Sequence, residues 1–83
     1  MRILLAEDDR DLNASIAALL THAGYQVDAV FNGEEAYDAA CDGYDGMILD
    51  WMMPKLDGVE ALRRMRADGV HTPCLFLTAR DAV

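Results

Sequence analysis

The stretch MILDWMMPKLDG, residues 47–58, opens with a short apolar run that ends on an aspartate, Asp50. Such a run, bounded by turn-forming residues, is typical of a strand buried on both faces of a parallel sheet. A carboxylate at the end of a buried strand costs several kcal/mol unless a partner compensates it. The partner of Asp50 is therefore either a structural donor, such as a helix N-terminus, or a ligand that the protein binds.

Apolar runs and helical patterns alternate on both sides of this strand. Strands are expected at residues 2–6, 25–30, 47–50 and 73–78, and helices between them over about 10–23, 33–41 and 58–68. The order is βαβαβαβ, which predicts an α/β fold: a doubly wound parallel sheet with right-handed crossovers and helices on both faces. The third helix is expected to turn Val59, Leu62 and Met65 inward.

Each expected helix begins at a residue that can cap it. Asp9 precedes the first helix, and Asn32 with Glu35 and Asp57 with Glu60 have the spacing of capping boxes for the second and third. These residues mark where the three helices are expected to begin. The methionines at 47, 52, 53 and 65 are expected to be packing residues, because methionine fills irregular gaps in a core.

Composition limits the class of protein. The chain has 83 residues, 53% of them hydrophobic, and a net charge of -8 from 15 acidic and 7 basic residues. This size fits one small domain, and the negative charge argues against direct contact with nucleic acid or an anionic membrane. Cys41 and Cys74 lie far apart with no secretory leader before them, which predicts reduced thiols and a cytoplasmic location. No apolar stretch is long enough to span a bilayer.

Polar residues gather where the expected strands end. Glu7, Asp8 and Asp9 follow the first strand, Asp50 ends the third and Thr78 ends the fourth. Parallel strands bring these residues to one edge of the sheet, where ligands bind in open α/β folds. Clustered carboxylates suit Mg²⁺, and an aspartate beside a metal can accept a phosphoryl group. The Thr78 hydroxyl would then donate to a phosphoryl oxygen.

Structural roles compete with these assignments. Asp9 taken alone is better read as a helix cap. For Asp50, capping of the following turn and a role in binding are about equally supported by chain order. Thr78 taken alone is most simply a strand-end hydroxyl bonded to backbone.

Three stretches carry a resemblance to a known family. ILLAEDD (3–9), MILDWMMPKLDG (47–58) and PCLFLTAR (73–80) resemble, in order and spacing, the signature stretches of the response regulator receiver domain of two-component signalling. The wording DWMMPKLDGVEALRRMR further resembles the winged-helix, DNA-binding branch of these regulators. The resemblance implies a flavodoxin-like receiver fold with strand order 2-1-3-4.

The resemblance also implies roles. Asp50 would be the phosphoacceptor, taking a phosphoryl group from a phosphohistidine on a sensor histidine kinase. Glu7, Asp8, Asp50 and the backbone carbonyl of Met52 would hold Mg²⁺, and Thr78 would be the switch hydroxyl that moves toward the phosphate.

Family receivers continue through a fourth helix, a fifth strand and a fifth helix, which these 83 residues lack. The chain is therefore expected to be a partial receiver domain, residues 1–83, truncated after its fourth strand. The apolar strand CLFL (74–77) would then be an edge that recruits another chain. We expect a homodimer or a domain-swapped oligomer rather than a persistent monomer, and contact with DNA only through a downstream domain.

Two other classes of function remain open beside a signalling domain that is not an enzyme. A Mg²⁺-dependent aspartyl-phosphate phosphotransferase or phosphatase usually carries a second acid two residues after its nucleophile, and that place is taken by Met52. The third class is an interaction module that is never phosphorylated and keeps its acids only as caps.

Overall fold

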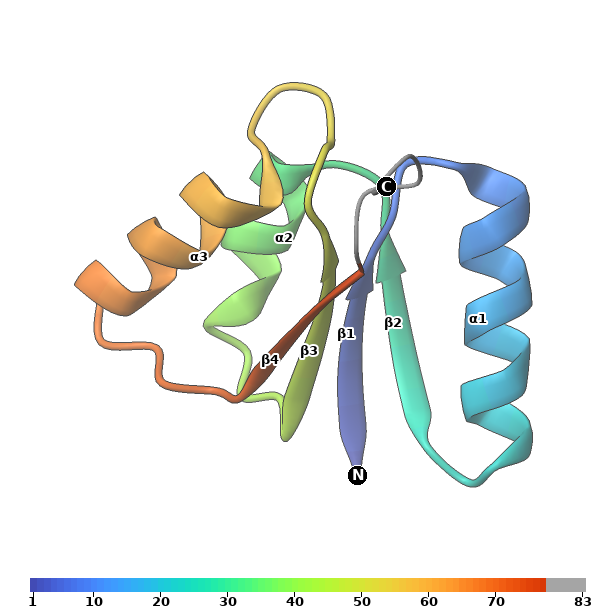
Figure 1. The fold of residues 1–83 in the computed structure, drawn as a ribbon. Helices are drawn as coiled ribbons and strands as arrows, with labels where there is room; N and C mark the ends of the chain where they lie inside the picture. The colour runs from blue at the N-terminus through green and yellow to red at the C-terminus, as the bar shows by residue number, and fades with distance from the viewer. Residues whose placement is uncertain (78–83) are drawn as a thin grey trace.

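A computed structural model of the chain describes residues 1–77, and a four-stranded parallel sheet of order β2-β1-β3-β4 lies at its centre (Figure 1). The elements are β1 (Arg2–Ala6), α1 (Arg10–His22), β2 (Gln26–Val30), α2 (Gly33–Ala40), β3 (Gly46–Asp50), α3 (Gly58–Ala67) and β4 (Cys74–Leu77). The predicted element order and strand order are confirmed. Within residues 1–77 no helix combines the length and the apolar character that crossing a membrane requires.

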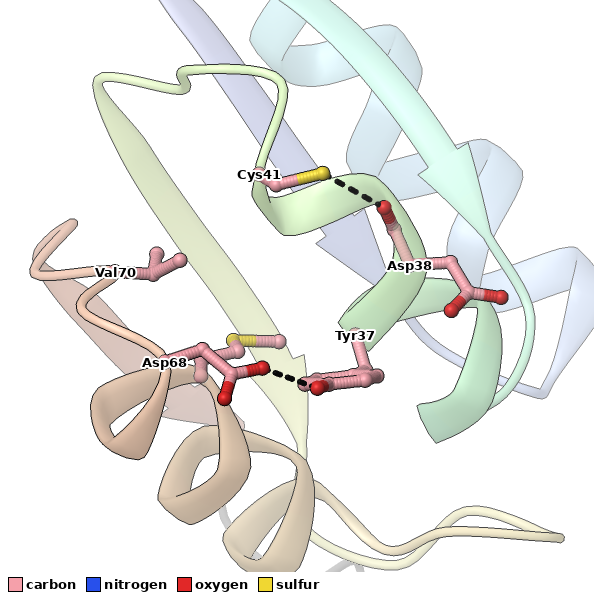
Figure 2. A pocket seen from close by; sticks show the side chains of 6 residues that line it. Tyr37, Asp38, Cys41, Asp68 and Val70 are labelled. Atoms are coloured by element: carbon pink, nitrogen blue, oxygen red, sulfur yellow. Dashed lines mark hydrogen bonds between the residues drawn. The ribbon is translucent and has the colours of Figure 1, made fainter.

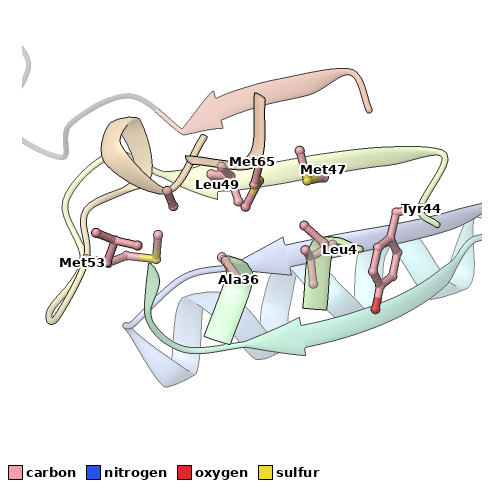
Figure 3. Packing of buried hydrophobic residues seen from close by; sticks show 11 residues of the cluster. Leu4, Ala36, Tyr44, Met47, Leu49, Met53 and Met65 are labelled. Carbon is pink, nitrogen blue, oxygen red and sulfur yellow. The ribbon is translucent and has the colours of Figure 1, made fainter. Parts of the chain in front are cut away.

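The helices cover both faces of the sheet. α1 packs on β2 and β1 from one side, and α2 and α3 lie together on the other side (Figure 1). The main hydrophobic core fills the space between the sheet and α2 and α3, and Figure 3 shows Leu4, Leu49 and Met65 within it. The core therefore fixes β1 and β3, the two central strands, most firmly.

The predicted helix caps are present. The Asp9 carboxylate accepts the N–H groups of Asp11 and Leu12, both at 3.1 Å. The side chains of Asn32 and Asp57 accept N–H groups in the first turns of α2 and α3, at 2.9 and 2.8 Å. Each helix thus begins directly beside the end of the preceding strand or loop, and its free N–H groups are partly satisfied.

Glu35 and Glu60, the glutamates of the two predicted capping boxes, have different partners. The Glu35 carboxylate accepts the N–H of Phe31, one residue before the cap, at 2.8 Å. The Glu60 carboxylate forms ion pairs with Arg63 and Arg64 at 2.8 and 3.5 Å, so it does not close a box with Asp57. Opposite charges three and four residues further along a helix compete for the glutamate.

The prediction that Val59 and Met52 are buried is wrong. Val59 is 40% exposed because small residues, Gly58 and Ala61, occupy the inner face of α3 and let the helix approach the sheet. Met52 is 61% exposed in the loop after β3, whereas Met47 and Met65 are buried as expected.

β4 forms one edge of the sheet within the described residues. It pairs with β3 from Met47–Cys74 to Asp50–Leu77, and Leu75, on the opposite face from the main core, is 70% exposed. The main contacts of α1 with the sheet are with β2 and β1, and on the β4 side of that face Leu75 is exposed.

Candidate functional site at the carboxyl edge of the sheet

Three carboxylates converge where β1 and β3 end. The two strands pair directly, with Ala6 opposite Leu49, so Glu7 and Asp8 after β1 come beside Asp50 at the end of β3. One carboxylate oxygen from each of Glu7, Asp8 and Asp50 lies within 4.8 Å of the others. Sequence reasoning predicted this convergence, because strand ends of a parallel sheet share one edge.

The cluster is buried and electrostatically strained. Glu7 and Asp50 are only 1% and 2% exposed. Burial, opposed by the hydrogen bond from the Asp9 N–H and assisted by the neighbouring Asp8 and Asp50 side chains, raises the pKa of the Glu7 carboxyl to about 7. That N–H donates to Glu7 Oε2 at 2.8 Å. Three acids held this close favour a bound cation, which would relieve their repulsion.

Of the other predicted residues, Asp9 and Met52 are near neighbours of the cluster in the chain. Asp9 is exposed, and its carboxylate caps α1, which confirms the structural reading given to it. Met52 lies in the loop after β3 with its side chain exposed. Thr78 lies outside the described residues.

Gly58 holds the loop after β3 against the site. Its N–H donates to the carbonyl of Trp51 at 2.9 Å, and a Cβ atom at this position would lie 2.2 Å from the carbonyl oxygen of Asp50. Only glycine permits such an approach between the start of α3 and the end of β3. The Asp-Gly pair that follows the loop is therefore part of what fixes the position of Asp50.

The rim beside Asp50 is mostly apolar. Trp51, Met52, Met53 and Asp57 line a pocket of about 530 Å³. Trp51 is half exposed, and its ring lies 6.1 Å from that of Phe76 on β4. Trp51 is thus an indole beside the acid cluster that can report on changes there.

Sequence reasoning missed a second pocket and two residues near the site. Tyr37, Cys41 and Asp68 help to line a pocket of about 210 Å³ between α2 and the end of α3, away from the acid cluster, where the Tyr37 hydroxyl donates to Asp68 (Figure 2). Arg10, at the start of α1, lies 4.1 Å from the ring centre of Phe31. An arginine next to acids gives no sequence signal for its aromatic partner.

Asn13 is the other residue that the pattern did not reveal. It is 2% exposed, and its Nδ2 donates to the carbonyls of Glu7 and Val30, both at 3.0 Å. The sequence does contain a signal for this burial, because Asn13 lies on the same helix face as Ile16, Ala17 and Leu20.

Known proteins share this sequence and this geometry. The family model described as response regulator receiver domain matches residues 3–83. Response regulator MprA of Mycobacterium avium (strain 104) is 46% identical over 84 residues, covering 100% of this chain. The chain spans about 37% of the length of that relative.

Two solved structures carry the same fold. The receiver domain of sensor histidine kinase PA1611 from Pseudomonas aeruginosa PAO1, which has a magnesium ion coordinated in its active-site cleft, has a TM-score of 0.91 and 36% identity, over 98% of this chain and 69% of that one. Response regulator TrrA from Thermotoga maritima, in complex with Mg²⁺-BeF, has a TM-score of 0.87 and 33% identity, over 96% of this chain and 70% of that one. With a family match over nearly the whole chain and a relative at 46% identity, this chain belongs to the response regulator receiver domain family.

Proposed function

We propose that Asp50 is the phosphoacceptor of this receiver domain and that it takes a phosphoryl group from a phosphohistidine of a sensor histidine kinase. The observation that carries the proposal is the convergence of Asp50 with Glu7 and Asp8 within 4.8 Å at the carboxyl edge of the sheet. Capping of α1 explains Asp9. It does not explain why two buried acids, Glu7 and Asp50, lie side by side.

The donor set fits Mg²⁺. Carboxylate oxygens are hard ligands, and Mg²⁺ is usually held by one or two carboxylates together with waters and phosphate oxygens. Glu7, Asp8, Asp50 and the backbone carbonyl of Met52 would hold the ion in this protein. When bound, Mg²⁺ would neutralise charge on the phosphoryl oxygens. The magnesium in the PA1611 receiver and the Mg²⁺-BeF in TrrA support this assignment.

The transfer itself uses the carboxylate of Asp50. One of its oxygens forms a bond to phosphorus while the phosphorus–nitrogen bond of the donor histidine breaks, and the released imidazole takes up a proton from solvent. The product on this chain is an acyl phosphate. Thr78, which lies outside the described residues, is proposed to donate its hydroxyl to a phosphoryl oxygen.

A signalling role is favoured over a classical phosphatase or phosphotransferase. An enzyme with an aspartyl nucleophile needs an acid to protonate its leaving group, and the residue two positions after Asp50 is Met52. A receiver domain generally passes on a signal rather than turning over a small substrate. A protein that responds to neither Mg²⁺ nor a phosphoryl mimic would instead be an interaction module that is not phosphorylated.

The proposed partners follow from the same observations. The sensor histidine kinase would approach the edge of the sheet that carries Asp50. A second copy of the chain is a proposed partner at β4, where Leu75 is 70% exposed. DNA would be contacted only by another domain of a longer protein. Light scattering that gives the mass of one chain at all concentrations would contradict the proposed self-association.

Trp51 fluorescence provides a direct test. Titration with Mg²⁺ and then with beryllofluoride, a phosphoryl mimic, is expected to change the emission in two saturable steps. Asp50→Asn should abolish the beryllofluoride step and weaken the Mg²⁺ step, whereas Asp38→Asn, an exposed acid on α2, should leave both unchanged. A folded protein that responds to neither reagent would contradict the proposed function.

A further inference from the structure

α1 turns one buried polar side chain toward the sheet, at Asn13. Its Nδ2 atom donates to the carbonyl oxygens of Glu7 and Val30, both at 3.0 Å, and its side chain is 2% exposed. Val30 is the last residue of β2 and Glu7 directly follows β1, so both acceptors are carbonyls at strand ends. A buried amide costs free energy unless it is bonded in this way, so its place is specified by those two carbonyls.

The hydrogen bonds of Asn13 belong to a group of hydrogen bonds around Glu7. The Val30 carbonyl also accepts the N–H of Glu7 at 3.2 Å, and the Glu7 carboxylate accepts the N–H of Asp9 at 2.8 Å. Asp9 in turn caps the helix that carries Asn13. Glu7 is therefore held at its carbonyl by Asn13 of α1 and at its N–H by Val30 of β2.

A contact at the surface also links α1 to the end of β2. The guanidinium of Arg10 lies 4.1 Å from the centre of the Phe31 ring, so the first residue of α1 holds the residue that follows β2. Asn13 and Arg10 thus tie the same helix to the same strand end, one from within and one at the surface.

We propose that Asn13 is a positioning residue for the cation site: it acts through the Glu7 carbonyl to hold the carboxylates of Glu7 and Asp8 facing Asp50. This inference rests on the proposed function, because it assigns a role in Mg²⁺ binding. Residues that orient metal ligands from behind typically change metal affinity 10- to 100-fold when they are replaced. A residue that only packs α1 on the sheet would change stability alone.

Asn13→Ala tests the proposal, with Tyr44→Phe as a matched control. Tyr44 is also buried, and its hydroxyl donates to Asp28 at 2.7 Å among residues away from the acid cluster. For Asn13→Ala we expect the Mg²⁺ dissociation constant, measured by Trp51 fluorescence, to rise about tenfold. In metal-free protein the Asp9 N–H should exchange with solvent faster than in wild type and in the control. Tyr44→Phe should lower stability but leave the Mg²⁺ dissociation constant within about twofold of wild type.

Other outcomes are distinguishable. An Asn13→Ala protein with wild-type Mg²⁺ affinity and wild-type Asp9 exchange would overturn the positioning role and leave the proposed function standing. A wild-type protein that does not bind Mg²⁺ would overturn the proposed function and this inference with it. Should Asn13→Ala fail to fold, Asn13→Ser keeps one hydroxyl donor and is expected to bind Mg²⁺ more weakly than wild type, whereas unchanged affinity would again overturn the proposal.

Discussion

Replacing Glu7 with glutamine removes one negative charge from the acid cluster and keeps an oxygen that can accept the Asp9 N–H. In metal-free protein we expect Glu7→Gln to be more stable than wild type at neutral and alkaline pH. The reason is that burial penalises the ionised form of Glu7, and the carboxylates of Asp8 and Asp50, whose oxygens lie within 4.8 Å, add to that penalty. Mg²⁺ should reverse the order, because the variant loses a ligand of the ion.

The magnitude follows from the structure in two ways. Two unit charges at 4.8 Å, the upper limit of the oxygen separations in the cluster, repel by about 3 kcal/mol at an effective dielectric constant of about 20. The rise in the pKa of Glu7 from 4.5 to about 7 also corresponds to about 3 kcal/mol. The gain in unfolding free energy for Glu7→Gln is therefore expected to reach at most about 3 kcal/mol.

The sign of the pH dependence is fixed by the raised pKa. Below the ordinary value of 4.5, Glu7 is protonated in both the folded and the unfolded chain, so wild type and variant should differ little. Between 4.5 and about 7 the folded protein holds a proton that the unfolded chain has released, so the stability of wild type relative to the variant falls as pH rises. Above about 7 the full difference should be present.

Urea unfolding followed by Trp51 fluorescence, at about pH 5 and about pH 8 with EDTA or with Mg²⁺, measures these differences. Glu34→Gln, at an exposed position in the first turn of α2, is the control and should show no such pH dependence. A Glu7→Gln protein that is less stable than wild type at about pH 8 in EDTA, or a difference that does not change with pH, would refute the reasoning.

Three further changes have expected outcomes. Gly58→Ala should lower the unfolding free energy by about 3 kcal/mol, since its Cβ would lie 2.2 Å from the Asp50 carbonyl oxygen; Gly46→Ala, which meets only a side-chain carbon at 3.3 Å, is the control, and equal losses in urea unfolding would contradict this account. Asp57→Ala removes the cap of α3 and should cost about 1 kcal/mol with no loss of helix signal elsewhere; an unchanged denaturation midpoint would contradict the cap. The pKa of Tyr44 is raised from 10 to about 12 by burial, so stability should fall as pH rises from 10 toward 12; the same slope in Tyr44→Phe would assign the loss to other groups.

The fold was predictable because each level of the sequence agrees with the next. Apolar runs ending at Ala6 and Asp50, with caps at Asp9 and Asp57, define strands and helices whose alternation leaves few topologies. The same topology predicts that Glu7 and Asp8 lie beside Asp50, because parallel strands end at one edge of the sheet.

The remaining details depend on close packing, which periodicity does not encode. The hydrophobic pattern predicts Val59 on the inner face of α3, but the small residues Gly58 and Ala61 occupy that face and let the helix approach the sheet. The role of Asn13 is not evident from the sequence because a lone asparagine in a helix is usually solvent-facing, and only the positions of two carbonyls reveal it.

Incubation of the protein with acetyl phosphate and Mg²⁺, followed by intact mass measurement and borohydride reduction of the acyl phosphate before peptide mapping, tests the central claim most directly. The account predicts the added mass of one phosphoryl group, reduction at Asp50, and no added mass in Asp50→Asn or in the presence of EDTA. Added mass that persists in Asp50→Asn, reduction at another carboxylate, or a wild-type protein that gains no mass would contradict it.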